Sequence, residues 1–198
     1  MPGELTARRP DSRVAREAED LVRVVAPPFL TNHSFRSHYF AVALGERDGI
    51  RFDDELLYVA SLLHDIGLVE EFDTGKCFEE DGADVAKRLA LSEGWTAERA
   101  EAAAGAIRLH TAVEIALEDG AEAFLLWHST GLDVAGHRYD EIDSVTVAAL
   151  LAVYPRLDFK EGFMALVADQ AERKSGCWAD RAVAGGLRER IAAAPFES

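Results

Sequence analysis

The sequence is poor in cysteine and has no long hydrophobic run. Cys77 and Cys177 are the only cysteines, and neither has metal-site spacing or a disulfide-rich context. We therefore predict two reduced thiols in a cytoplasmic protein. No apolar stretch approaches the roughly 20 residues that a membrane-spanning helix needs. Residues 1–12 are polar, contain proline and lack a signal-peptide pattern, so they predict a flexible tail.

Positive charge is also scarce. Acidic residues outnumber Lys and Arg, 36 to 21, which gives a formal net charge of −15. This charge repels nucleic-acid phosphates and anionic lipid surfaces, so the sequence predicts neither of these as partners. The expected partner is a small-molecule substrate. The sequence leaves open whether the chain also forms a homo-oligomer. The same charge weakly disfavours a highly anionic substrate, although a metal or a local Arg or Lys cluster could override it.

Alternating runs of β-branched residues are missing, whereas apolar residues recur at helical spacing along the whole chain. Connections between these segments are short, and no linker or internal repeat divides them. The sequence therefore predicts an all-α fold with one domain over 13–198. Helices are expected over 11–26, from 31 or 32 to 45, from 53 or 54 to 67, and over 79–93, 96–109, 118–127, 140–153, 159–173 and 181–194.

The strongest local signal is the LLHDIG stretch at 62–67. An apolar helix presents His64 and Asp65 side by side, and Gly67 then ends it. Neighbouring side chains point about 100° apart, so both reach one ion only if it lies between them. An imidazole and a carboxylate suit a divalent first-row metal, and a buried Asp is costly unless it is paired or metal-bound. Taken alone, the pair is still best interpreted as an ordinary polar helix end.

The wider context changes that interpretation. Upstream lies NHSFRSHYFAVAL, downstream lie CFEEDGADVAKRL and TGLDVAG, and SLLHDIGL stands between them. The order of a His, a His-Asp pair and a later Asp resembles the ligand order of the HD superfamily. The four segments are similar to the cyanamide hydratase-like branch, and the likeness spans roughly residues 21 to 175. It implies a compact HD-type helical domain with a metal site between central helices.

The resemblance also implies which residues hold the metal. These are His33, His64, Asp65 and Asp133, supplied by three helices, and they would leave open positions for water and substrate. One divalent transition metal is expected, zinc first and iron second. A second metal, held through His110 or His128, is the weaker alternative to a single metal with His110 lining the pocket.

Other residues have two interpretations each. Arg36 lies one turn after His33, so it could reach the pocket or brace an acidic ligand. Glu79 could shuttle protons near the metal or complement the dipole at a helix start. The expected catalytic residues are Asp65, Glu79 and His110, and the expected substrate-contacting residues are Phe35, Arg36, Phe78 and His128.

These residues predict a metal-dependent enzyme that activates water. The resemblance favours hydration of a small nitrile such as cyanamide to a urea- or amide-like product. The alternative is a phosphohydrolase acting on a nucleotide or small phosphoester, which would need a second metal or an Arg/Lys clamp. The net acidity and the closer resemblance favour the hydratase. A ligand-binding domain without turnover ranks last, because the four presumptive ligands are present.

Overall fold

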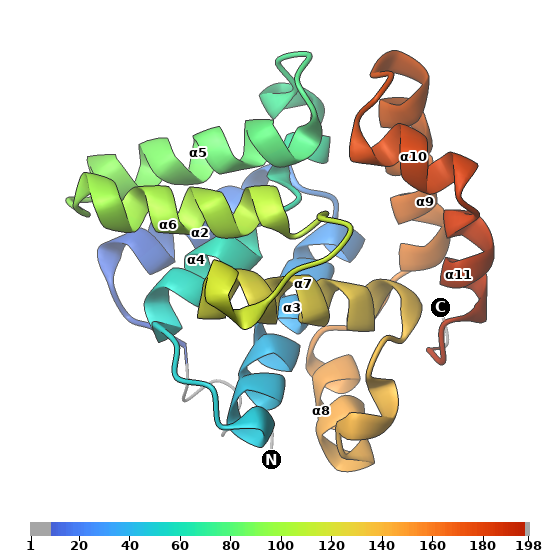
Figure 1. Ribbon diagram of the computed structural model, residues 1–198, viewed down its shortest axis with the longest axis horizontal. Helices are drawn as coiled ribbons and strands as arrows, with labels where there is room; N and C mark the ends of the chain where they lie inside the picture. The colour runs from blue at the N-terminus through green and yellow to red at the C-terminus, as the bar shows by residue number, and fades with distance from the viewer. Residues whose placement is uncertain (1–8, 197–198) are drawn as a thin grey trace.

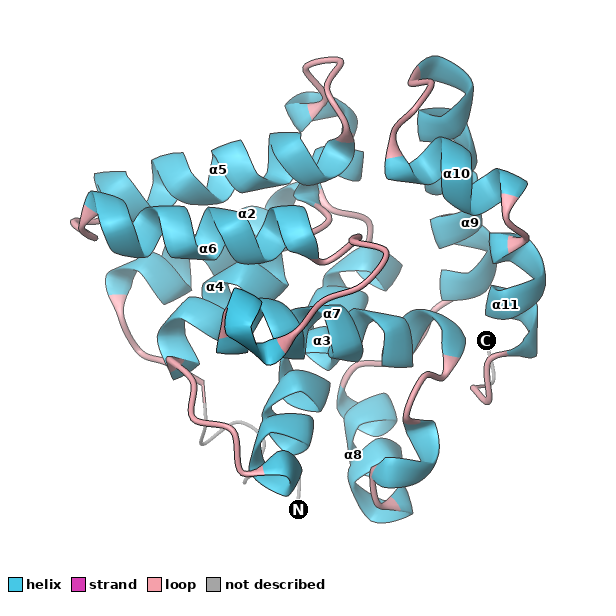
Figure 2. Ribbon diagram, in the orientation of Figure 1, coloured by secondary structure: helices cyan, strands magenta, loops and turns pink. Residues whose placement is uncertain are grey.

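The computed structural model describes residues 9–196, and every regular element within them is a helix, which confirms the all-α prediction (Figures 1 and 2). The α-helices are α2 (Arg13–Val25), α3 (Pro28–Asp48), α4 (Asp54–Leu63), α5 (Phe78–Ser92), α6 (Ala97–Leu109), α7 (Ala121–Ala135), α8 (Ser144–Val153), α9 (Phe159–Arg173), α10 (Trp178–Ala184) and α11 (Leu187–Ala193). Short 3₁₀ turns are η1 (Ile66–Leu68), η2 (Glu70–Phe72), η3 (Leu117–Asp119) and η4 (Tyr139–Glu141). Within these residues, no helix combines the length and apolar character needed to cross a bilayer.

The helices surround α3 and α4, which lie at the centre. Helix α5 packs along α6, α3 packs along α7, and α4 contacts α3, α5, α6 and α7. Helices α9, α10 and α11 form the opposite side of the molecule from α5 and α6 (Figure 1). The side chains of α4 are buried from Leu56 to Leu63, because its apolar run faces neighbours all round. The centre of the fold therefore holds the element that leads into the His-Asp pair.

The turn after α4 brings His64 and Asp65 against the start of α5. Helix α4 begins at an Asp53 cap and ends at Leu63, earlier than the predicted end at Gly67, because Asp65 leaves the α region with φ −105° and ψ 8°. Turn η1 then passes so close to α5 that a Cβ on Gly67 would lie 2.1 Å from the Phe78 carbonyl oxygen. Gly67 therefore permits this contact, which no larger residue could make.

Several further boundaries differ from the predictions. Helix α8 begins at Ser144, after the expected start at 140, because the Asp143 side chain caps it. Helix α3 begins at Pro28, before the expected start at 31 or 32, because proline fits the first turn of a helix. Helix α7 continues beyond Trp127 to Ala135, so Asp133 lies on a helix. The helix expected over 181–194 is two helices, interrupted at Gly185 and Gly186. Residues 1–8 of the expected tail lie outside the described residues, so its flexibility stays a prediction.

The prediction of two reduced thiols is wrong for this structure. Cys77 and Cys177 form a disulfide, with Cα atoms 5.4 Å apart, although 100 residues separate them in the sequence. The bond joins the residue before α5 to the residue before α10. Only the packing of these two helix starts brings the cysteines together, and cysteine spacing carries no signal of it. The cytoplasmic location stays a prediction.

Candidate metal site

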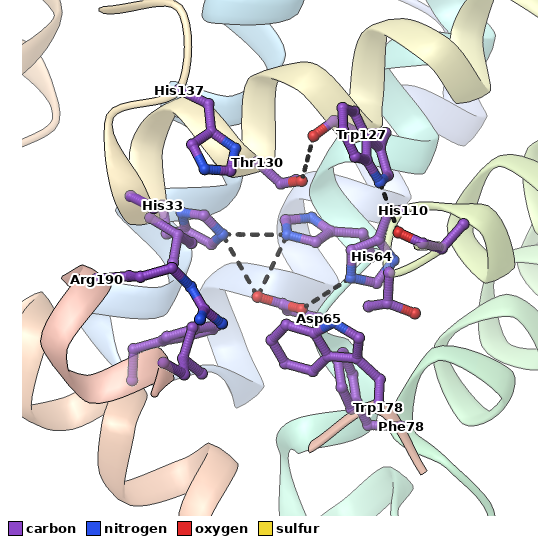
Figure 3. Close-up of a pocket in the computed structure, with 17 residues that line it drawn as sticks. His33, His64, Asp65, Phe78, His110, Trp127, Thr130, His137, Trp178 and Arg190 are labelled. Atoms are coloured by element: carbon purple, nitrogen blue, oxygen red, sulfur yellow. Dashed lines mark hydrogen bonds and ion pairs between the residues drawn. The ribbon is translucent and has the colours of Figure 1, made fainter. Parts of the chain in front are cut away.

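Three buried groups from two central elements converge on one point (Figure 3). His33 comes from α3, and His64 and Asp65 follow α4 directly. The His33 Nε2 atom lies 3.1 Å from His64 Nε2, and the Asp65 Oδ2 atom lies 3.4 Å and 3.2 Å from these two nitrogens. All three side chains are no more than 3% exposed. The structure therefore brings together three of the four expected ligands.

Hydrogen bonds at the Nδ1 atoms of His33 and His64 determine which ring nitrogens face this point. His64 Nδ1 lies 2.7 Å from the Ser61 carbonyl oxygen, and His33 Nδ1 lies 2.7 Å from Asp133 Oδ2. Because both partners are acceptors, each Nδ1 carries the proton and each Nε2 is left with a lone pair. Asp65 Oδ2 has no hydrogen-bond partner within residues 9–196. Three electron-rich atoms thus face one another, an arrangement that a cation between them would stabilise.

The charge states of these groups suit a metal. Burial by itself would raise the Asp65 pKa, but the surrounding histidines hold it well below its usual value. Burial lowers the pKa of His64, so this ring is neutral. Burial also opposes charge on His33, but the nearby carboxylates of Asp133 and Asp65 outweigh that effect and raise its pKa, so a metal would have to displace a proton from this ring. Neutral imidazoles and an ionised carboxylate are the forms that bind zinc or iron, so the donor set fits a divalent transition metal.

Asp133, the fourth expected ligand, is placed behind His33 and outside the group of three. Its carboxylate accepts two hydrogen bonds from Arg36, both of 2.8 Å, and one of 3.0 Å from Arg156. Burial would raise the Asp133 pKa, but the two guanidinium groups hold it far below its usual value. Arg36 therefore braces an acidic residue, which is the second of its two interpretations. Asp133 in turn orients the His33 ring.

A cavity of about 190 Å³ opens beside the three groups, and His110 also lines it (Figure 3). The His110 Nδ1 atom lies 2.5 Å from the Ile107 carbonyl oxygen, and its Nε2 lies 3.5 Å from Asp65 Oδ1. His110 is thus beside Asp65 but outside the group that could share an ion. The rest of the lining is mainly apolar, and its aromatic members are Phe78, Trp127, Phe163 and Trp178.

The structure brings only Phe78, of the four expected substrate-contacting residues, into the cavity lining. Phe35 stacks on Tyr154, with ring centroids 4.8 Å apart, and His128 packs against Phe124 at 4.3 Å. Glu79 is buried in the first turn of α5 but does not line the cavity. The side chains of Phe35 and His128 thus pack against other aromatic rings and not against the cavity.

Sequence reasoning missed part of the lining altogether. Trp178, Leu187 and Arg190 line the cavity from α10 and α11. These helices lie beyond the stretch with family resemblance, and no residue pattern links them to the His-Asp pair. Their amphipathic character predicts a buried face without indicating what that face covers.

Two comparisons with known proteins agree with this site. The profile of the HD domain family matches residues 30–144, which is more than half of the chain and includes all four expected ligands. Two cyanamide hydratases of Saccharomyces cerevisiae, DDI2 and DDI3, are each 31% identical to this chain over 174 residues. The alignment covers 83% of this chain and 76% of either relative.

Proposed function

This chain belongs to the HD domain family, and we propose that it is a metal-dependent hydratase that adds water to a small nitrile such as cyanamide. The observation that carries the proposal is the convergence of His33 Nε2, His64 Nε2 and Asp65 Oδ2 beside a small, largely apolar cavity. The likeness to cyanamide hydratases across most of the chain supports the choice of substrate. Cyanamide has only three heavy atoms and no charge, so it suits such a cavity.

We assign the metal to His33, His64 and Asp65, with zinc as the first expectation and iron as the second. When bound, a divalent ion of this kind lowers the pKa of a water molecule toward neutrality and polarises the substrate. Asp133 keeps the His33 Nε2 lone pair directed at the site through its hydrogen bond to Nδ1. Asp133 therefore acts through His33 in this arrangement, and a test of its variants must include metal content.

The remaining chemistry is addition without a leaving group. The water oxygen forms a bond to the nitrile carbon, one π bond of the C≡N group breaks, and the nitrogen takes a proton. A second proton shift from oxygen to nitrogen gives urea from cyanamide. We assign proton transfer to His110, because it lines the cavity and its Nε2 lies 3.5 Å from Asp65 Oδ1. Glu79, the other expected proton carrier, does not line the cavity. Phe78 and Trp127 help to exclude bulk water.

The charges around the cavity argue against a phosphoester substrate. Among the described residues of the lining, Arg190 alone carries a permanent positive charge. Arg36 is committed to Asp133, and Lys76 and Lys87 form ion pairs with other acidic residues, Asp84 and Glu101 respectively. A transferred phosphoryl group would need more positive charge than this lining supplies.

The test combines metal analysis with two activity assays on the purified protein. We expect about one equivalent of zinc or iron per chain, urea formation from cyanamide, and no release of nitrophenol from bis(4-nitrophenyl) phosphate. His110→Gln should keep the metal but lower kcat about 10²- to 10⁴-fold, the usual contribution of a general acid or base. The matched control is His128→Gln, because His128 lies outside the lining. Phosphodiester cleavage without cyanamide hydration, or metal-loaded protein inactive on cyanamide and other small nitriles, would contradict the proposal.

A further inference from the structure

One side of the cavity is built by residues from outside the stretch that matches the HD domain family. Trp178 of α10 and Leu187 and Arg190 of α11 line the cavity, and we name these three residues the C-terminal wall. All of them lie beyond residue 144, where the family match ends. In Figure 3, Trp178 lies beside Phe78 below Asp65, and Arg190 approaches from the side of His33. The family match therefore accounts for the metal groups but leaves one side of the pocket unexplained.

The disulfide holds this wall against the metal-binding part of the fold. Cys177 immediately precedes Trp178, and Cys77 immediately precedes Phe78. The two aromatic rings, both in the lining, meet edge to face with centroids 5.8 Å apart. Phe78 in turn meets the His110 ring at 5.7 Å. One covalent bond thus sets the distance between an aromatic residue of the wall and an aromatic residue beside the expected proton carrier.

A second, polar attachment lies just before α10. Asp73 forms ion pairs with Lys174 at 2.8 Å and with Arg173 at 2.7 Å. It also accepts a hydrogen bond of 3.1 Å from Gln170. These contacts hold the end of α9 to the loop before Cys77 and do not depend on the disulfide. Opening the disulfide would therefore release the start of α10 while the end of α9 stayed attached.

We propose that the Cys77–Cys177 disulfide is a redox-sensitive clasp for the C-terminal wall, and that Trp178 is the residue through which it limits substrate size. Cys77 is partly exposed, whereas Cys177 is buried, so we assign attack by an external thiolate to Cys77. A dithiol reductant forms a mixed disulfide there and breaks the Cys77–Cys177 bond. Its second thiol then closes its own disulfide, and two electrons and two protons end on the two cysteines.

The consequence for substrate choice rests on the proposed nitrile hydration. With the clasp closed, Trp178 and Phe78 narrow a cavity of about 190 Å³, which admits a molecule as small as cyanamide. With the clasp open, Trp178 can move away from Phe78 and bulkier nitriles can enter. Opening should therefore change selectivity without removing the metal, because His33, His64 and Asp65 come from α3 and the end of α4, and none of them lies on α10 or α11.

The first experiment does not depend on activity. Hydrogen–deuterium exchange is compared between oxidised protein, protein treated with dithiothreitol, and the Cys77→Ser/Cys177→Ser variant. We expect exchange in residues 178–193 to rise about tenfold after reduction and in the variant, with α4 and α6 unchanged and the metal retained. The variant should not respond to dithiothreitol. Unchanged exchange in residues 178–193, or an equal rise throughout the fold, would overturn the clasp.

The second experiment measures selectivity, as the ratio of kcat/KM for benzonitrile to that for cyanamide. Reduction, Cys77→Ser/Cys177→Ser and Trp178→Ala should each raise this ratio roughly tenfold, a change typical of altered pocket size. Trp95→Ala is the matched control, because Trp95 packs against Arg99 away from the cavity. If the ratio stays the same after reduction and in both variants, Trp178 does not limit substrate size and its proposed role is overturned. If no nitrile is hydrated, the proposed function fails, while the exchange experiment still decides whether the clasp exists.

Discussion

Asp133 offers the sharpest test of the site, because its negative charge neutralises two buried cations. Arg36 is fully buried and Arg156 is 3% exposed, and both guanidinium groups donate to the Asp133 carboxylate. Arg36 reaches it with two hydrogen bonds of 2.8 Å. Asp133→Asn keeps the shape of the side chain but removes its charge. The variant would leave two guanidinium groups in the interior without a counter-ion.

The expected loss of stability follows from that burial. Removing one partner of a buried ion pair costs about 3 to 5 kcal/mol, because the remaining charge is uncompensated. For a chain of this length, each kcal/mol lowers Tm by about 2 to 4 °C. We therefore expect Asp133→Asn to lower Tm by roughly 6 to 20 °C, a range that combines these two estimates. The variant should also bind metal more weakly, since His33 loses its charged hydrogen-bond acceptor.

The assay is thermal and urea unfolding of chelator-treated protein, so that metal loss does not contribute to the difference. Arg156→Met is the matched partner variant, because a methionine can keep the contacts with Phe159 and Phe196. The double variant Asp133→Asn/Arg156→Met should lose about 1 kcal/mol less than the sum of the single variants, as expected for directly coupled groups. The reasoning is refuted if Asp133→Asn unfolds within about 1 kcal/mol of the wild type, or if the double variant is additive.

Three further predictions test other parts of the molecule. Asp65→Asn should lose the metal and cyanamide hydration. In chelator-treated protein it should also destabilise the fold, because the histidine contacts that lower the Asp65 pKa stabilise its carboxylate. Elemental analysis, urea detection and unfolding check this, and unchanged metal content would contradict it. Burial lowers the His38 pKa from 6.5 to about 3. The contribution of neutral, buried His38 to the free energy of unfolding is therefore fully present above pH 6.5 and should fall by about 1.4 kcal/mol per pH unit below it. His38→Phe should remove this contribution from the slope of unfolding free energy against pH, measured from pH 7 to 5. An equal slope in the wild type and the variant would argue against it. Gly67→Ala should lower the free energy of unfolding by more than about 2 kcal/mol, because its Cβ would overlap the Phe78 carbonyl. Gly105→Ala, which has open space around it in α6, should raise that free energy by about 0.5 to 1 kcal/mol. Comparable unfolding midpoints for the two variants would contradict this.

Local patterns were sufficient for most of the helices. The expected 159–173 segment coincides with α9, and Thr96 caps α6 as its position suggests. Apolar spacing and capping residues act within a few residues of the chain, so they can be read without knowing the fold. One error falls where a helix end depends on a neighbouring element. Helix α4 stops short of Gly67, where η1 packs on α5.

The His-Asp pair and His33 were identified from short segments and a resemblance, and the structure brings these three residues together. Their convergence was predictable because two of them are adjacent and all three lie on or next to buried central helices. The position of Asp133 was not. Its carboxylate meets Arg36 across 97 residues of sequence and Arg156 across 23, and these partners decide which way it faces.

By itself, then, the sequence determined an acidic, all-α chain, because residue type and spacing express such properties locally. Its resemblance to the HD superfamily added four expected metal ligands, of which the structure brings His33, His64 and Asp65 together. Only the tertiary structure decided that Arg36 braces Asp133, that Cys77 meets Cys177, and that Trp178 lines the cavity. Each of these contacts joins segments far apart in the chain. Their geometry follows from how whole helices pack, and helix packing is a property of all the buried surfaces together.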